Sequence, residues 1–456
     1  MTLVKFSGKA GPNALHARPG YVSGEFKGAL AGAITSPATN LTAIIATLNG
    51  IVNPNGLTTN IHFNWGLTNA YGNTTAPQNI GNGTLPVNVS ANITGLAYNT
   101  LYHFQVVAVN ADGTSTGADL TFTTPFQLVN LANVNINNDE SGSSAVDPIH
   151  GFHYVGSYND GANLWLTKIN SATMIVDSQL DLHTFINTHG NVAERTTTMT
   201  IDPVNQLLYI IVNDQINYSN MLKIDAQTMT IISSSIDIND LGFTDSEIDL
   251  VNGFIYATST FGVAFNLYQF NFALLITNTA NLDASTQNEC IAIDPANNVC
   301  YVAQVTGYVG KYNLTTFAEI ARFQLDVSNT TIRGLSLDLT AQILYAVSTN
   351  SNILWKIDLT NFNAGGVTSL VLANTGTMGV LFEPSLNYVL IGYNQTPAKT
   401  GIVNAGTFTE GQVLTLSAGE NSFQFISGLK AYDFTNHLWY LPCFTNTVID
   451  VKIQVD

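Results

Sequence analysis

The sequence predicts an all-β protein in three parts: an extended N-terminal arm (residues 1–37), a β-sandwich (residues 38–125) and a seven-bladed β-propeller (residues 126–456). Two observations support this prediction. Residues 38–125 contain short runs in which apolar and polar residues alternate, and turn-forming Gly, Asn and Pro residues separate these runs. Residues 126–456 then repeat a unit of four such runs with one acidic turn, and the unit occurs seven times.

The composition argues against several classes of protein. The chain has 456 residues, with 31 acidic against 14 basic residues, and a net charge of −17. Nucleic-acid binding requires clustered Lys and Arg, so we expect no nucleic-acid partner. Three cysteines are too few for a disulfide scaffold or a cysteine-rich zinc site. The N-terminus lacks the apolar core of a secretory signal, and no apolar run is long enough for a transmembrane helix, so we expect neither secretion by that route nor membrane insertion.

The first 37 residues are interpreted as an anchoring arm. They are rich in Gly and Ala, show no helical or strand periodicity, and carry a net charge of +3, which leaves −20 for the other residues. We expect basic side chains to steer the arm to an acidic surface and apolar side chains to hold it there; a solvated tail without a role is the alternative. The predicted anchoring residues are Leu3, Val4, Lys5, Phe6, Lys9, Arg18, Tyr21, Phe26 and Lys27.

The next segment, residues 38–125, is predicted to form a sandwich of roughly seven strands, because turn signals recur along its alternating runs. It resembles bacterial and phage fibronectin type III-like modules over its whole length. The resemblance rests on motifs such as Ala46-Thr-Leu-Asn-Gly50, Phe63-Asn-Trp-Gly66 and Thr100-Leu-Tyr102. It implies that Tyr102 ties a corner through a hydrogen bond between its hydroxyl and the backbone, and that the module is a spacer or adhesion unit.

The repeat in residues 126–456 begins with a strand that ends in an acidic turn. A second strand is centred on Tyr, a third often contains Lys-Ile-Asp, and a fourth alternates; residues 200–225 show the first three clearly. An acidic side chain at such a turn accepts hydrogen bonds from backbone N–H groups two residues on, so we predict a structural role for these acids. The turn acids are Asp147, Asp202, Asp249, Asp294, Asp338, Glu383 and Asp433.

The ends of the repeat predict how the propeller closes. The seventh copy stops after its third strand at Asp456, whereas residues 126–134 alternate like a fourth strand. We predict that residues 126–134 pair as the outermost strand of the last blade, residues 421–456, because this pairing removes an exposed sheet edge. The repeat resembles the YVTN/NHL-like family of seven-bladed propellers. That family includes binding proteins, lactonases, lyases and surface-layer proteins, so the resemblance implies an architecture and leaves the activity open.

Candidate metal ligands lie where the first strands of the repeats begin, around one rim of the predicted channel. Carboxylate and Asn oxygens there could hold Ca²⁺, as in lactonase-type propellers; the alternative is that Glu and Arg pair across neighbouring blades. The candidates are Glu140, Glu194, Asn288 and Glu289, with Arg195 and Arg333 nearby. His183 and His189 share one loop, and we expect exposed loop histidines rather than a ligand pair. No catalytic motif occurs, so we predict no enzyme activity and no cofactor other than possible Ca²⁺.

These features favour a structural or adhesion protein on a virion surface, either a phage capsid decoration or a tail-associated protein. Its partners would be other virion proteins and copies of itself, and the propeller would be displayed to a host-surface glycan or protein. Few charges with many Asn and Thr residues give a coat of neutral hydrogen-bonding groups. The alternatives are a metal-dependent propeller enzyme of the lactonase or lyase type, and a bacterial adhesin at the cell surface or outside the cell.

Overall fold

The computed structural model describes residues 29–455, apart from residues 43, 126–127, 136–139, 159–163, 194, 215–217, 262–265, 283–287, 326–330, 350, 396, 417–429 and 444–448. The chain divides into two compact units, Met1–Pro125 and Phe126–Asp456. Both units consist of antiparallel strands, which confirms the predicted all-β class. The predicted anchoring residues 3–27 lie outside the described residues. None of the described helices is long and apolar enough to cross a membrane.

The first unit is a sandwich of two antiparallel sheets. Its strands are β1 (Gly32–Thr39), β2 (Ile45–Asn53), β3 (Asn60–Gly66), β4 (Asn73–Thr74), β5 (Gln78–Asn79), β6 (Val87–Thr94), β7 (Leu101–Asn110), β8 (Gly113–Thr116) and β9 (Leu120–Thr123). One sheet has the order β1-β2-β6; the other has the order β4-β3-β7-β8, with β5 beside β3 and β9 beside β7.

The sandwich core is built from alternate residues of the two sheets, as the period of two in a strand requires. Leu48 and Val52 from one sheet meet Phe63 and Phe104 from the other, and all four side chains are fully buried. The hydroxyl of Tyr102 accepts a hydrogen bond from the backbone N–H of residue 97 at 2.9 Å. This bond ties the chain just before β7 to that strand.

The start of the sandwich corrects the predicted boundary of the arm. The strand β1 begins at Gly32, inside the segment 1–37 that the sequence analysis assigned to the arm, and pairs with β2 from Gly32 opposite Asn53. The chain is tied down even before β1, because Ala31 is buried and its carbonyl accepts a hydrogen bond from Ser115 Oγ at 2.6 Å. The sequence analysis missed this strand because its Gly, Ala and Pro residues obscure the alternation.

In the described part of the chain the second unit contains seven antiparallel groups of four strands, each called a sheet below; a single residue pair, Tyr158 opposite Arg195, joins the first two groups. The first three comprise β11 (Glu140–Asp147), β12 (Phe152–Tyr158), β13 (Trp165–Asn170) and β14 (Ile175–Asp181); β15 (Arg195–Asp202), β16 (Leu207–Asn213), β17 (Ser219–Asp225) and β18 (Thr230–Ser234); and β19 (Leu241–Asp249), β20 (Phe254–Phe261), β21 (Asn266–Asn271) and β22 (Ile276–Asn281). The next three comprise β23 (Asn288–Asp294), β24 (Val299–Gln304), β25 (Tyr308–Asn313) and β26 (Glu319–Gln324); β27 (Ile332–Asp338), β28 (Ile343–Ser348), β29 (Ile353–Asp358) and β30 (Val367–Val371); and β31 (Thr377–Glu383), β32 (Tyr388–Tyr393), β33 (Lys399–Asn404) and β34 (Thr409–Thr415). The last comprises β35 (Tyr432–Asp433), β36 (Leu438–Cys443), β37 (Ile449–Val455) and β10 (Leu128–Asn135). The described residues also form four short 3-10 helices, η1 (Leu182–Thr184), η2 (Pro295–Asn297), η3 (Leu359–Asn361) and η4 (Ala364–Gly366).

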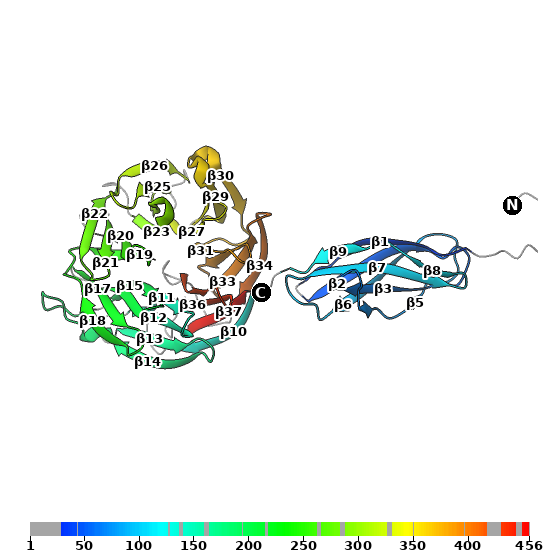
Figure 1. Ribbon diagram of the computed structural model, residues 1–456, viewed down its shortest axis with the longest axis horizontal. Helices are drawn as coiled ribbons and strands as arrows, with labels where there is room; N and C mark the ends of the chain where they lie inside the picture. Colours follow the sequence, from blue (N-terminus) through cyan, green and yellow to red (C-terminus); the bar gives the residue numbers. More distant parts are fainter. Residues whose placement is uncertain are drawn as a thin grey trace, which may run out of the picture. The chain divides into compact units, whose positions relative to one another are not determined.

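These seven sheets stand in a ring, with the first strand of each sheet nearest the centre (Figure 1). Apolar clusters fill all seven junctions between neighbouring sheets, including the junction of the last sheet with the first. At that final junction the ring of His153 stacks on Tyr440, with 4.3 Å between the ring centroids. The ring of sheets is the architecture of a seven-bladed β-propeller, and each sheet is called a blade below.

The last blade takes its outermost strand from the beginning of the unit, where the sequence analysis placed the closing strand. The strand β10 pairs antiparallel with β37 through seven residue pairs, from Leu128 opposite Val455 to Asn135 opposite Ile449. The side chain of Leu128 is almost fully buried in the cluster between the sixth and last blades. Residues 126 and 127 of the predicted closing strand lie outside the described residues.

The acidic turns share one local geometry. Asp202 shows it: its carboxylate accepts hydrogen bonds from the backbone N–H groups of Val204 and Asn205, both at 3.1 Å. The residue four positions after the acid has a positive φ in every blade, which closes the turn into the second strand. Corresponding carboxylate-to-backbone hydrogen bonds occur at Asp147, Asp249, Asp294, Asp338, Glu383 and Asp433.

Lysines in the third strands join neighbouring blades. Lys168, Lys223 and Lys356 each donate a hydrogen bond from Nζ to a backbone carbonyl in the turn after the third strand of the next blade, at 3.2–3.3 Å. Lys452 makes the same contact from the last blade to the carbonyl of Ser171 in the first blade, at 2.7 Å. The contact that links consecutive blades therefore also links the two ends of the propeller.

Candidate functional site

The first strands of the blades surround the centre of the ring, and a β-bulge positions equivalent residues along them. In six first strands the pairing register shifts by one residue five positions before the turn acid. A bulge re-aims the extra side chain away from the regular alternation. The extra residues are Gly142, Thr197, Thr244, Glu289, Arg333 and Met378.

Glu289 and Arg333 are therefore equivalent residues of neighbouring blades, and they form an ion pair. Arg333 Nη1 lies 3.4 Å from Glu289 Oε2, with the Glu289 side chain 5% exposed and the Arg333 side chain 32% exposed. Burial raises the pKa of Glu289 to about 7, while Arg333 opposes this shift. This is the cross-blade pair that the sequence analysis set against a metal site.

The other predicted ligands do not join this pair in the described structure. Asn288 is fully buried, and its Oδ1 accepts a hydrogen bond from Gln304 Nε2 at 3.4 Å within its own blade. Glu194 and the side chain of Glu140 lie outside the described residues, although Glu140 begins β11 at the predicted rim. The described residues contain no group of three or more His, Cys, Asp or Glu residues that could hold a metal ion.

We expect Glu289→Gln to stabilise the propeller above neutral pH. A carboxyl group whose pKa is raised on folding holds an extra proton in the folded state between its usual value and about 7, so stability falls as pH rises through that window. Gln mimics the protonated form and removes this loss, which amounts to about 3 kcal/mol at pH 8. Thermal unfolding at pH 5 and pH 8 measures the effect, and an unchanged difference between the two pH values would contradict it.

A second charged cluster lies between the first strands. Lys430 Nζ lies 2.6 Å from Asp245 Oδ2 and 2.6 Å from Glu247 Oε1, and donates to the carbonyl of Ile291 at 3.2 Å. The Asp245 side chain is fully buried, and it also accepts a hydrogen bond from the backbone N–H of Ile291 at 3.0 Å. Lys430, just before β35 of the last blade, thus contacts β19 and β23 of the third and fourth blades.

Glu247 and Lys430 also line a cavity of about 260 Å³ at the end of the first strands that carries the acidic turns. Its other walls are mainly apolar side chains from the fourth, fifth and sixth blades, such as Leu335, Leu337 and Leu381. The ammonium group of Lys430 already has three acceptors, so its charge is used to hold the blades together.

This cluster was not predicted from the sequence, although the repeat contains a signal for it. Asp245 and Glu247 lie two residues apart in a first strand and so share a face, and both precede the turn acid Asp249. Lys430 lies three residues before the turn acid Asp433, which aligns it with the first strands. Aligning all seven copies on the turn acid would have placed the three side chains in the centre of the ring.

The two loop histidines have separate partners. His183 Nδ1 lies 3.0 Å from the carbonyl of Ala193, within the same loop. His189 Nδ1 lies 2.6 Å from Asp237 Oδ2 in the second blade, and its ring stacks on Tyr218 with 3.9 Å between centroids. Hydrogen bonds lower the pKa of Asp237 to about 2 although burial opposes this, so the carboxylate stays charged beside His189. These contacts fix the loop on the second blade.

Comparison of the chain with protein-family models and with curated protein sequences finds no match.

Proposed function

We propose that this protein is a structural and adhesion protein of a virion surface. In this proposal the basic N-terminal segment attaches the chain to other virion proteins or to copies of itself, and the propeller is displayed to a host-surface glycan or protein. The resemblance of the two units to fibronectin type III-like modules and to YVTN/NHL-like propellers supports a role in display and binding.

The observation that supports a structural role most directly is the pairing of charges at the centre of the propeller. Glu289 pairs with Arg333, and Lys430 pairs with Asp245 and Glu247, in both cases between different blades. An enzyme of this architecture would direct such groups at a substrate or a metal ion. Here they neutralise one another and join the blades.

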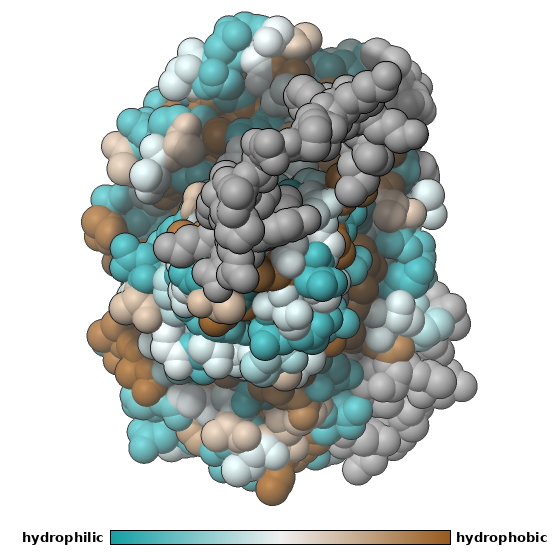
Figure 2. Space-filling model, turned by 90° about the vertical axis from the view of Figure 1, so that its right-hand side faces the viewer, coloured by the Kyte–Doolittle hydropathy of each residue, from teal (hydrophilic) through white to brown (hydrophobic). Residues whose placement is uncertain are grey.

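The surface of the sandwich supports an exterior location. On the sheet β1-β2-β6, Thr47 Oγ1 donates to Asn92 Oδ1 at 2.8 Å, and Asn49 Nδ2 donates to Thr39 Oγ1 at 3.0 Å, so neutral side chains link neighbouring strands. On the face shown in Figure 2, hydrophobic residues are interspersed among hydrophilic ones. Hydrogen bonds between neutral groups depend little on ionic strength, because salt screens interactions between charges. The coat of an exposed particle requires this independence.

The proposed attachment is tested by removing residues 1–28, which leaves Ala31 and β1 intact. The full segment 1–37 is unsuitable for deletion, because its last residues belong to the sandwich. We expect the truncated protein to fold with an unchanged melting temperature, because both units retain their cores. We also expect it to be missing from purified particles, as measured by quantitative mass spectrometry.

A charge variant distinguishes, in the same assay, the basic side chains that would steer the segment to its partner from the apolar side chains that would keep it bound. Replacing Lys5, Lys9, Arg18 and Lys27 by Gln should slow incorporation at low salt and have little effect at high salt, because exposed charges mainly raise association rates. Normal incorporation of the truncated protein would contradict the attachment role.

One observation favours the enzyme alternative. A carboxyl group with a pKa of about 7, as at Glu289, has the protonation behaviour of a general acid or base. Lactone hydrolysis that depends on Ca²⁺ and disappears in Glu289→Gln would favour a metal-dependent enzyme over the structural proposal. We expect no such hydrolysis from the purified protein.

A further inference from the structure

The fifth blade departs from the repeat at its last turn. In the other blades whose four strands follow one another in the sequence, four or five residues join the third strand to the fourth. In the fifth blade, eight residues, 359–366, join β29 to β30. These eight residues form the two short helices η3 and η4. Insertions into single copies of a repeat are often the binding elements of such proteins.

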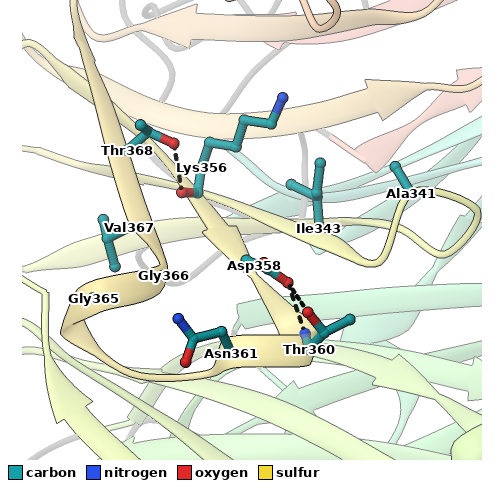
Figure 3. Close-up of a pocket in the computed structure, with 10 residues that line it drawn as sticks. All are labelled: Ala341, Ile343, Lys356, Asp358, Thr360, Asn361, Gly365, Gly366, Val367 and Thr368. Atoms are coloured by element: carbon teal, nitrogen blue, oxygen red, sulfur yellow. Dashed lines mark hydrogen bonds between the residues drawn. The ribbon is translucent and has the colours of Figure 1, made fainter.

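This insertion borders an open cavity of about 510 Å³ at the acidic-turn end of the fifth blade (Figure 3). The volume falls within the range of small-molecule sites. Figure 3 shows Asp358, Thr360 and Asn361 at one end of the cavity and Lys356 at the other. The apolar side chains of Ile343 and Val367 lie between these ends. All of the lining residues come from the fifth blade.

The loop that forms the cavity has a defined conformation. Asp358 caps η3 by accepting hydrogen bonds from the backbone N–H and the hydroxyl of Thr360, at 2.8 and 2.6 Å. These hydrogen bonds lower the pKa of Asp358 and keep its carboxylate charged. Gly366 approaches the carbonyl of Asn361 so closely that a Cβ there would lie 2.2 Å from the oxygen. These hydrogen bonds and this close approach constrain the backbone of the insertion.

The polar groups of the cavity include both donors and acceptors. The ammonium group of Lys356 donates one hydrogen to the carbonyl of Ala405 and lies 5.6 Å from the centroid of the Phe408 ring, and no other acceptor for it lies among the described residues. Asn361 accepts from Asn363 through its side-chain oxygen, and none of the described residues accepts from its amide nitrogen. Asp358 Oδ1 receives both hydrogen bonds from Thr360, and the further lone pairs of the carboxylate can accept from a ligand. A ligand here meets two donors, one carboxylate and an apolar wall.

We propose that this cavity binds a neutral saccharide, one or two sugar units of a glycan. Sugar hydroxyls both donate and accept, so they can use Asp358 together with Lys356 and Asn361. The C–H face of a sugar ring can pack on Ile343 and Val367. An anionic ligand would meet the Asp358 carboxylate and a chain of net charge −17, and a cationic ligand would meet Lys356.

This inference rests on the proposed adhesion function, because the cavity is open and a single site of this kind binds weakly. Many copies on one particle would raise the effective affinity without any new contact, by making later binding events intramolecular. A shallow site at the surface of each copy is therefore sufficient for attachment to a glycan-covered host.

The test uses the full chain and measures binding by saturation-transfer NMR and calorimetry. The probes are glucose, galactose, mannose, N-acetylglucosamine, maltose and lactose, with glucuronate and N-acetylneuraminic acid as anionic probes.

The exposed Ala341 lies at the edge of the cavity, so Ala341→Trp should fill the cavity. The turn should stay intact, because the backbone N–H of Ala341 still donates to Asp338. Asp358→Asn keeps the cap but removes the charge. The control is Ala296→Trp, at an exposed alanine in the corresponding turn of the fourth blade.

We expect at least one neutral sugar to bind the wild type and Ala296→Trp equally, and to bind Ala341→Trp and Asp358→Asn about ten-fold more weakly or not at all. Binding that is unchanged in Ala341→Trp and Asp358→Asn would overturn the site and leave an adhesion function intact. Binding of anionic probes alone, or of none of the probes, would overturn the neutral-saccharide assignment. Particle incorporation of the truncated protein tests the proposed function independently of all these outcomes.

Discussion

Deleting residues 126–135 should prevent the propeller from forming a stable monomer. The deletion removes β10, which makes seven residue pairs with β37, and leaves that strand as an exposed edge. It also removes Leu128 and Ala132 from the clusters that the last blade shares with its two neighbours. We expect a loss of more than about 5 kcal/mol, comparable with the whole stability of a typical domain. Size-exclusion chromatography should show aggregates in place of a monomer.

A cross-link tests the same strand pairing without removing residues. Val129 and Gln454 face each other in the β10–β37 ladder. In the double variant Val129→Cys/Gln454→Cys we expect a disulfide that raises the unfolding free energy by up to about 5 kcal/mol, because it closes a very long loop. A monomeric, cooperatively unfolding deletion variant, together with failure of the cross-link under oxidising conditions, would show that the propeller closes in another way.

The sequence predicted the parts of the fold that depend on repetition. A carboxylate that accepts backbone N–H groups at a turn leaves the same local pattern in every copy, so Asp147 and Asp433 mark equivalent turns although they are far apart in the chain. The closing strand was predictable for a related reason: a last copy with three strands and a leading segment that alternates fit only one closed arrangement. By contrast, β1 lacks a regular alternation and was assigned to the arm.

The candidate site was predictable in position and less so in chemistry. Counting back from the turn acids placed Glu289 and Arg333 near one rim, and both turned out to be bulge residues of adjacent blades. Whether such groups bind a metal or each other depends on the direction in which a bulge turns each side chain, and strand periodicity carries no information on that. The contact between Lys430 and Asp245 spans 185 residues, so no pattern within one copy of the repeat indicates it, and only an alignment of all the copies does.

Replacing Lys430 by Met should destabilise the propeller strongly. Asp245 has no exposed side-chain surface, and Lys430 is its only cationic partner in the described structure. Removing one partner of a buried pair leaves an uncompensated charge and costs about 3–5 kcal/mol. Met fills a volume similar to that of the lysine stem, so the loss reports on the charge more than on packing. Thermal or urea unfolding of the full chain measures it, with Lys311→Met, at a lysine in the third strand β25, as the control.

The pH dependence and a second substitution separate this effect from a simple loss of contacts. Burial raises the pKa of Asp245 to about 6 in the wild type, and Lys430 is the largest influence that opposes the shift, so the pKa rises further in Lys430→Met. When folding raises the pKa of an acid, the unfolding free energy of the protein falls as pH rises towards that pKa. The variant should therefore lose more stability at pH 8 than at pH 5. Adding Asp245→Thr should recover much of the loss, because Thr198 occupies the equivalent buried position in the preceding blade. Equal losses at both pH values, with no recovery in the double variant, would show that Lys430 acts through packing and that the charges at the centre of the ring are incidental to its stability.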